Sequence, residues 1–320
     1  MCVAFAQGML AEPASWPMLE SAAQGRTELR QELARAAVAE VDEEHRARYA
    51  GLLHRACEPL EPETAAALFP ALAEWAPWQP EIAEMLVAAT TDLDDRAVWA
   101  MAGQELVELA ADDDGPYLRA LRAMLEATGD PDQPDAEPER DQPALQRGAS
   151  LLHHLLLHHR YRGGGRPTAD VLLRAADTAA GHEDFARSVA ELRLYALELN
   201  KDATALSSGL RRLAADCEGR PLLARDIAEG LSSRLSAISG PAPDAWLETA
   251  RTLGAEPGLA QGLFAIRLIV AGGSRSRWTE PWRGQLRTLR RHAHPDVRAS
   301  ARETVTAREA PPSVPGTIQW

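Results

Sequence analysis

Four histidines stand close together in the stretch LLHHLLLHH at residues 151–159. On a helix His154 and His158 lie one turn apart, and two neutral imidazoles at that spacing can share a metal ion. A metal site needs a third ligand and a hydrolase needs a general base, but the glutamate of the HExxH pattern is absent. Most of the leucines cover one arc of the helix, with both histidines at its edge. We therefore expect boundary histidines on a packed helix, and His154 and His158 are only weak metal candidates.

Arginine is concentrated near the C-terminus, where only Glu280 and Asp296 oppose it between residues 275 and 302. The candidate partner-binding residues of this basic strip are Arg275, Arg277, Trp278, Trp282, Arg283, Arg287, Arg290, Arg291, Arg298 and Arg302. Arginines beside aromatic rings suit a nucleic-acid backbone. They equally suit an acidic protein surface, including the N-terminal half of this chain. A solvated face of the last helices, without a partner, gives the same pattern.

Two further motifs have catalytic residue types without the required context. The segment 163–168 (GGGRPT) lacks the ending of a phosphate-binding loop and follows a helix, so we interpret it as a turn before a helix that starts at Pro167. Aspartates at 92, 94, 95 and 112–114 are candidates for a magnesium motif. Such clusters raise the possibility of an all-helical terpene cyclase, but the first group resembles a helix N-terminus and the second is cut by Gly115-Pro116. That family's second motif needs Asn, Ser and Glu, and here Asn200 is followed by Thr204 and Ser208 without the Glu.

The composition predicts a nearly all-helical fold. Alanine (60) and leucine (42) make up almost a third of the 320 residues, and both are strong helix formers. Isoleucine, phenylalanine and tyrosine, which favour strands, are scarce.

Several features favour a cytoplasmic protein without a membrane partner. Cys2, Cys57 and Cys217 are far apart and fit no metal-binding spacing, which favours a reducing compartment. The apolar N-terminus has no basic residue before Arg26 and is a poor signal peptide. No eighteen-residue window is apolar and uncharged, as a membrane span requires. We expect no cofactor and no small-molecule ligand.

The net charge of −13 is unevenly distributed. Residues 1–142 carry 29 acidic and 10 basic side chains, whereas residues 143–320 carry 18 acidic and 24 basic ones. Such a division is typical of two surfaces that face different partners, and it also arises when the charge of solvated helix faces drifts along a chain.

Apolar residues recur at helical spacing from residue 63 onward. The expected helix starts fall near residues 63, 80, 94, 116, 143, 167, 184, 202, 220, 243, 257, 279 and 295. A pair of helices thus recurs about every 38 residues, close to the period of HEAT or armadillo repeats. The stretch 259–271 is apolar on most sides and should be the most buried helix. The acidic, proline-rich stretch 129–142 interrupts the pattern as an exposed loop or linker.

The residues 294–298 (HPDVR), with Ala301 and Val305, resemble the second helix of a HEAT repeat whose first helix contains Trp282, Leu286 and Leu289. A similar opening stands at 94–98 (DDRAV). The resemblance implies a right-handed α-α superhelix, a HEAT-like α-solenoid of stacked helix pairs built for contact. An irregular stack of helical hairpins would give the same periodicity. Iron-binding HEAT-type hydroxylases carry several His-Glu pairs in symmetric repeats. This chain has only one in that order, His182-Glu183, so the resemblance to that group fails for lack of partner pairs.

From these patterns we expect acidic helical repeats over 1–128, the linker 129–142, C-terminal repeats with a basic end over 143–310, and a flexible tail over 311–320. The expected function is a non-catalytic scaffold that binds a protein partner. The chain also resembles the helical C-terminal sensor regions of bacterial signalling NTPases, which implies a regulatory part of a larger system. The alternative is a nucleic-acid-binding repeat protein that uses the strip 275–302, and the third reading is a metal-dependent all-α enzyme.

Overall fold

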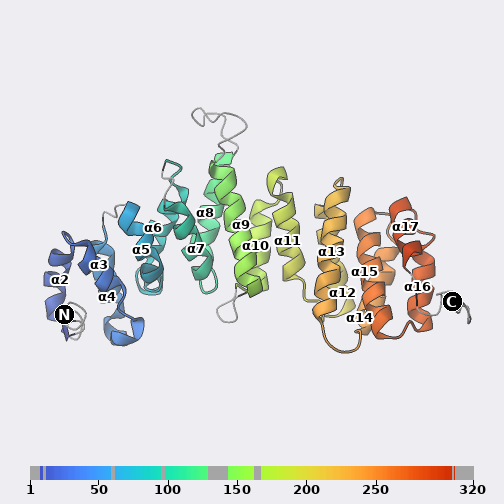
Figure 1. The fold of residues 1–320 in the computed structure, drawn as a ribbon, viewed down its shortest axis with the longest axis horizontal. Helices are drawn as coiled ribbons and strands as arrows, with labels where there is room; N and C mark the ends of the chain where they lie inside the picture. Colours follow the sequence, from blue (N-terminus) through green and yellow to red (C-terminus); the bar gives the residue numbers. More distant parts are fainter. Residues whose placement is uncertain are drawn as a thin grey trace, which may run out of the picture. The chain divides into compact units, whose positions relative to one another are not determined.

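The computed structural model describes residues 8–9, 12–58, 62–94, 98–128, 143–161, 167–304 and 306. In these residues the regular structure consists of sixteen α-helices and five short 3-10 helices, without a strand. The prediction of an all-α fold is therefore confirmed. The chain divides into two compact units, residues 1–185 (unit 1) and 186–320 (unit 2) (Figure 1). No helix within the described ranges has the length and apolar character that a membrane crossing requires.

In unit 1, helices that are two apart in the chain pack side by side. The α-helices are α2 (Trp16–Ala23), α3 (Thr27–Ala34), α4 (Arg46–Ala56), α5 (Pro62–Ala73), α6 (Pro80–Thr91), α7 (Trp99–Leu109), α8 (Gly115–Thr128), α9 (Pro143–Tyr161) and α10 (Ala169–Ala179). The 3-10 helices are η1 (Pro13–Ser15), η2 (Val38–Glu40), η3 (Glu43–His45), η4 (Ala76–Trp78) and η5 (Glu183–Phe185). One row contains α3, α5, α7 and α9, and the other contains α2 and α4, then η4, then α6, α8 and α10.

Unit 2 repeats this arrangement. Its helices are α11 (Ala186–Ala196), α12 (Ala203–Asp216), α13 (Pro221–Ala237), α14 (Asp244–Gly254), α15 (Leu259–Arg275), α16 (Glu280–Leu289) and α17 (Pro295–Glu303). The odd-numbered helices pack in one row and α12, α14 and α16 in the other, while most neighbours in sequence pack across the rows. Stacked helical hairpins have this contact pattern, so each unit is compatible with a helical repeat.

From residue 62 onward, all but one of the predicted helix starts agree with the structure to within two residues. The exception is α7, which was expected near residue 94 and begins at Trp99. The Asp92 carboxylate accepts a hydrogen bond from the Asp94 amide (3.1 Å), so Asp94 lies in a turn before the helix. The predicted start near residue 94 is therefore too early, and residues 95–97 of the predicted opening 94–98 lie outside the described residues. The expected linker 129–142 and tail 311–320 lie outside the described residues.

Aromatic rings in edge-on and tilted contact form part of the core of unit 1 near its start. Trp16, Tyr49 and Trp75 are buried, with ring centroids 5.5 Å apart for Trp16 and Tyr49 and 4.9 Å apart for Tyr49 and Trp75. The Tyr49 hydroxyl donates to the Leu33 carbonyl (2.9 Å), which satisfies the one polar atom of that ring. This cluster joins α2, α3 and α4, whose limits the sequence periodicity does not show.

Helix α15 lies at the centre of unit 2, in contact with α12, α13, α14, α16 and α17. Its glycines let large neighbours reach the helix backbone, because a Cβ at Gly272 or Gly273 would lie under 3.0 Å from the ring of Trp282 or Trp278. Most of its residues are buried, as predicted for the stretch 259–271. The helix is therefore the element around which unit 2 packs.

Candidate functional site

Part of the basic strip binds helix C-termini, where the last turn has carbonyl oxygens without intrahelical donors. Arg275 donates to the carbonyls of Leu235 (2.6 Å) and Ile238 (2.7 Å) at the end of α13. Arg290 makes the corresponding contacts at the end of α17, and Arg298 donates to the carbonyls of His292 (2.8 Å) and Ala293 (2.7 Å) in the α16–α17 turn. Arg275 and Arg290 thus hold one helix to another within unit 2, and Arg298 fixes the turn that precedes its own helix.

Arg234 repeats the contact of Arg275 at an offset of 41 residues. It donates to the carbonyls of Leu194 and Leu197 (2.9 Å to the latter) at the end of α11, and these acceptors also precede those of Arg275 by 41 residues. Each guanidinium carbon lies over an aromatic ring, 5.4 Å away for Arg234 and 5.1 Å for Arg275. Burial lowers the pKa of Arg234. The same device thus joins α13 to α11 and α15 to α13.

Other members of the strip are also engaged inside unit 2. Arg283 and Arg287 both pair with Glu280, with 2.9 Å between Arg283 and the carboxylate. Trp278 and Trp282 are only 8% and 6% exposed, so both rings contribute to the core around α15.

Three arginines of the strip are exposed, and no residue that the structure describes forms an ion pair with them: Arg277, Arg291 and Arg302. Arg251 on α14 has the same character, although the sequence reading did not single it out. The available signal was its position opposite the buried residues Trp246, Ala250 and Leu253 on one helix. The structure therefore separates a small set of accessible arginines from a larger structural set.

The histidines of α9 have different surroundings. His153 is exposed and His154 is partly buried, with ring centroids 6.2 Å apart. Burial, and next the neighbouring His153, lower the pKa of His154. His159 Nδ1 lies 2.8 Å from the Pro167 carbonyl. Among the described residues no group of three His, Cys, Asp or Glu side chains is placed to hold a metal, so the third ligand for His154 and His158 is not found there.

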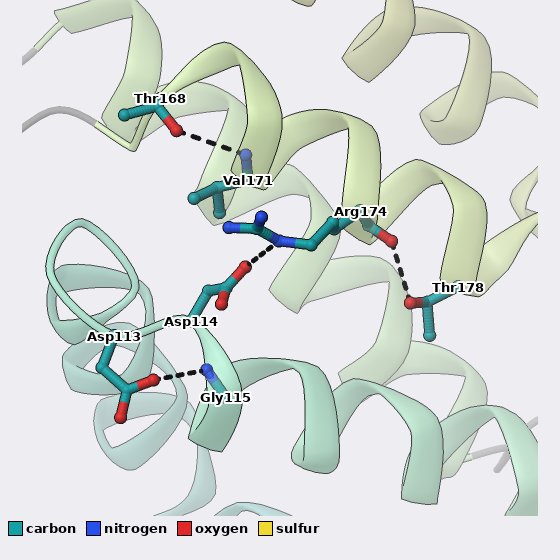
Figure 2. Close-up of polar contacts among 7 residues, drawn as sticks. All are labelled: Asp113, Asp114, Gly115, Thr168, Val171, Arg174 and Thr178. Atoms are coloured by element: carbon teal, nitrogen blue, oxygen red, sulfur yellow. Dashed lines mark hydrogen bonds and ion pairs between the residues drawn. The ribbon is translucent and has the colours of Figure 1, made fainter.

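The aspartates 112–114 stand at the start of α8, and two of them have structural contacts (Figure 2). Asp113 accepts a hydrogen bond from the Gly115 amide (2.9 Å), and Asp114 pairs with Arg174 of α10. Thr168, at the end of the GGGRPT segment, accepts from the Val171 amide (3.4 Å) and caps α10. These contacts assign helix-capping and helix-joining roles to residues that the sequence offered as metal or phosphate ligands.

Two cavities lie in unit 2. The larger, about 430 Å³, is lined by the end of α12, the α12–α13 turn, the start of α15 and His294 before α17, and its charged lining residues are Arg211, Glu218 and Arg220. The smaller, about 330 Å³, lies between the α14–α15 and α16–α17 turns and includes Glu256 and Arg291. Cys217 lines the larger cavity, and burial raises the pKa of its thiol to about 12. A thiol that stays protonated is a poor nucleophile.

A third cavity, of about 400 Å³, lies between α5 and α7 in unit 1 and is acidic. Its charged lining residues are Glu74, Glu105, Glu108 and Asp112. Four of the acidic side chains of the N-terminal half thus line one cavity.

Comparison of the chain with protein-family models, with curated proteins and with solved structures gives no match in any of the three cases.

Proposed function

We propose that the protein is a non-catalytic α-solenoid, built of HEAT-like helix pairs in a right-handed superhelix, that serves as a scaffold for a protein partner. The observation that carries the proposal is the recurrence of one helix-joining contact at Arg234 and Arg275 with the same offset in donor and acceptors. Stacks of repeated units present extended surfaces, and such surfaces are used mainly to bind other macromolecules.

The placement of the titratable groups agrees with a binding role. Burial raises the pKa of Tyr117, whose hydroxyl donates to the Leu151 carbonyl (3.1 Å), and burial likewise raises the pKa of Cys57 to about 11. Neither group lines one of the three cavities described above, whereas nucleophilic catalysis uses a group beside a general base in a cavity. We extend the proposal to a regulatory part of a larger signalling system, in the cytoplasm.

Nucleic-acid binding is the second candidate, favoured by the exposed Arg277, Arg291 and Arg302. It has less support than the strip suggested, because the other arginines contact protein groups and because Trp278 and Trp282 are buried away from stacking. A metal-dependent enzyme at His154 and His158 is the third candidate. Metal analysis of the purified protein tests it, because a metalloenzyme should contain about one metal ion per chain.

Affinity purification of the full chain from its native host, after nuclease treatment and chemical cross-linking, tests the leading proposal. We expect one protein to be recovered at a fixed molar ratio, with cross-links to defined helices. Fluorescence anisotropy with short DNA and RNA at 50 and 200 mM salt is the parallel arm. Salt-sensitive binding that Arg291→Ala with Arg302→Ala abolishes, without a stoichiometric protein, would overturn the proposal.

A further inference from the structure

The turn between α16 and α17 contains two histidines, and each of them accepts a hydrogen bond from a backbone amide two residues later. The His294 amide donates to His292 Nδ1 (3.0 Å), and the Asp296 amide donates to His294 Nδ1 (3.3 Å). The second bond caps the N-terminus of α17, a position that Ser, Thr, Asn or Asp usually occupies. These are the only two histidines of residues 186–320, so the cap of this helix depends on titratable rings.

The hydrogen-bond partners determine which ring nitrogens carry a hydrogen. His292 is 7% exposed, and its Nε2 lies 2.7 Å from the Glu256 carbonyl oxygen in the α14–α15 turn. A carbonyl oxygen can only accept and an amide can only donate, so His292 is neutral with its hydrogen on Nε2. His294 likewise has no hydrogen on Nδ1. A proton added to either Nδ1 would direct an N–H group at a backbone N–H group, and that hydrogen bond would be lost.

Helix α17 has few apolar contacts with the rest of unit 2. Of its nine residues only Val297 and Ala301 are buried. Val297 packs on the backbone of α15, because a Cβ added at Gly262 would lie 2.5 Å from its side chain. Arg290 donates to carbonyls at the other end of the helix. An element with so small a buried face can open while the rest of its unit stays folded.

Charged groups from several segments surround the two rings. They are Arg211 of α12, Glu218 and Arg220 of the α12–α13 turn, Arg225 of α13, Glu256 of the α14–α15 turn, Arg290 and Arg291 of the α16–α17 turn, and Asp296 and Arg298 of α17. Helix α15 presents Gly262, without a charge, to Cε1 of His292. Asp296 pairs with Arg225 (2.9 Å) and Glu256 with Arg211 (2.7 Å). An imidazolium in this turn would therefore have to compete with arginines for these two carboxylates.

We propose that His292 and His294 form a pH-sensitive latch, which holds α17 against α15 while both rings are neutral and releases it when the rings take up protons. Opening exposes the rings to water, where a histidine is half protonated near pH 6.5. The closed turn accepts only neutral rings, so protons bind to the open state and favour it as the pH falls. Each ring then raises the opening equilibrium constant about tenfold between pH 7.5 and pH 5.5, and both together raise it about a hundredfold. The released helix uncovers the α15 backbone at Gly262.

Amide hydrogen exchange of α17 in the full chain, compared at pH 7.5 and pH 5.5 after correction for the intrinsic pH dependence of exchange, measures this opening. In the wild-type protein we expect opening to increase about a hundredfold. His294→Asn keeps an oxygen that can accept the Asp296 amide but does not titrate in this range, so the increase should be about tenfold. The double variant His292→Asn with His294→Asn should show an increase of less than about twofold. His153→Gln, at an exposed histidine of α9, is the matched control and should keep the full increase.

The ring nitrogens provide a second measurement that needs no variant. Long-range proton–nitrogen NMR spectra of the wild-type protein at pH 7.5 should show both rings neutral, with the hydrogen on Nε2. A hydrogen on Nδ1 of either ring would overturn the proposal, as would a wild-type increase in opening below about threefold. An equal increase in the double variant, or its loss in the His153→Gln control, would also overturn it. The latch does not depend on the proposed scaffold function, so failure of one leaves the other standing.

Discussion

The two units use glycine differently. In unit 1 a Cβ added at any described glycine would lie 3.0 Å or more from its nearest neighbour, as at Gly103 and Gly148. In unit 2, six helical glycines would each bring a Cβ under 3.0 Å from a side chain of another segment: Gly209, Gly230, Gly254, Gly262, Gly272 and Gly273. In unit 2, side chains such as Trp282 therefore pack directly against the backbone of a neighbouring helix. In unit 1, the aromatic rings of Trp16, Tyr49 and Trp75 instead pack against one another.

Two arginine ion pairs, one in each unit, differ in how far they are exposed to solvent. In unit 2, Arg193 of α11 forms a nearly buried ion pair with Asp216 of α12, with side chains 8% and 14% exposed. In unit 1, the pair Arg119 and Glu84 joins α8 to α6 at the surface, with side chains 46% and 57% exposed. The α11–α12 contact in unit 2 thus removes an ion pair from water, whereas the buried arginine of unit 1, Arg147 (1% exposed), donates to the backbone carbonyls of Thr90 and Asp92. Some of the arginine in each unit therefore contributes to packing.

The largest expected effect separates these two ion pairs. Arg193→Met should destabilise the protein by about 3 kcal/mol, because it leaves the Asp216 carboxylate without its partner in a nearly buried position. Arg119→Met should cost about 0.5 kcal/mol or less, as exposed pairs do. Urea denaturation measures both. Equal losses of stability in the two single variants would show that burial does not distinguish the two ion pairs. The double variant Arg193→Met with Asp216→Leu should recover most of the stability lost in Arg193→Met, because no buried charge is then left unpaired.

The second effect tests the glycine contrast directly. Gly272→Ala should cost about 2 kcal/mol, because its Cβ would overlap the Trp282 ring and the core must move. Gly103→Ala should cost less, since its Cβ would meet only the end of the Leu151 side chain at 3.2 Å. Gly284→Ala is the control: nothing lies within 4 Å, and alanine should stabilise that helix by about 0.5 kcal/mol. Equal values at positions 103 and 272 would contradict the contrast.

The third effect asks whether the repeated contact is one device. Arg234→Met and Arg275→Met should each cost about 2 kcal/mol, because each leaves carbonyls at a helix end without a charged donor. Lysine at either position should not restore stability, since its point charge cannot span two carbonyls as the guanidinium fork does. Arg302→Met should change stability by less than about 0.5 kcal/mol. Losses that differ widely between positions 234 and 275 would argue against an equivalent role.

Local signals explain what the sequence predicted. Proline at position 221 and at position 295 marks the first residue of α13 and α17, and the helices begin there. The function of Arg275 could not be read in this way, because its acceptors stand about forty residues earlier in the chain. The burial of Trp282 likewise depends on a glycine of a different helix. Composition therefore identified the strip, but only tertiary contacts divide it into structural and accessible arginines.

The smallest effect concerns pH and unit 1. Because the pKa of His154 is lowered in the folded state, the unfolded chain binds more protons as the pH falls through about 6.5, and folding stability falls with it. His154→Gln should reduce the stability lost between pH 7 and pH 5 by less than about 1 kcal/mol, since the ring is partly solvated. NMR titration should give His154 a midpoint below the ordinary histidine value of about 6.5. A midpoint at or above that value, or identical pH slopes for the two proteins, would contradict this and leave His154 no different from a solvated surface histidine.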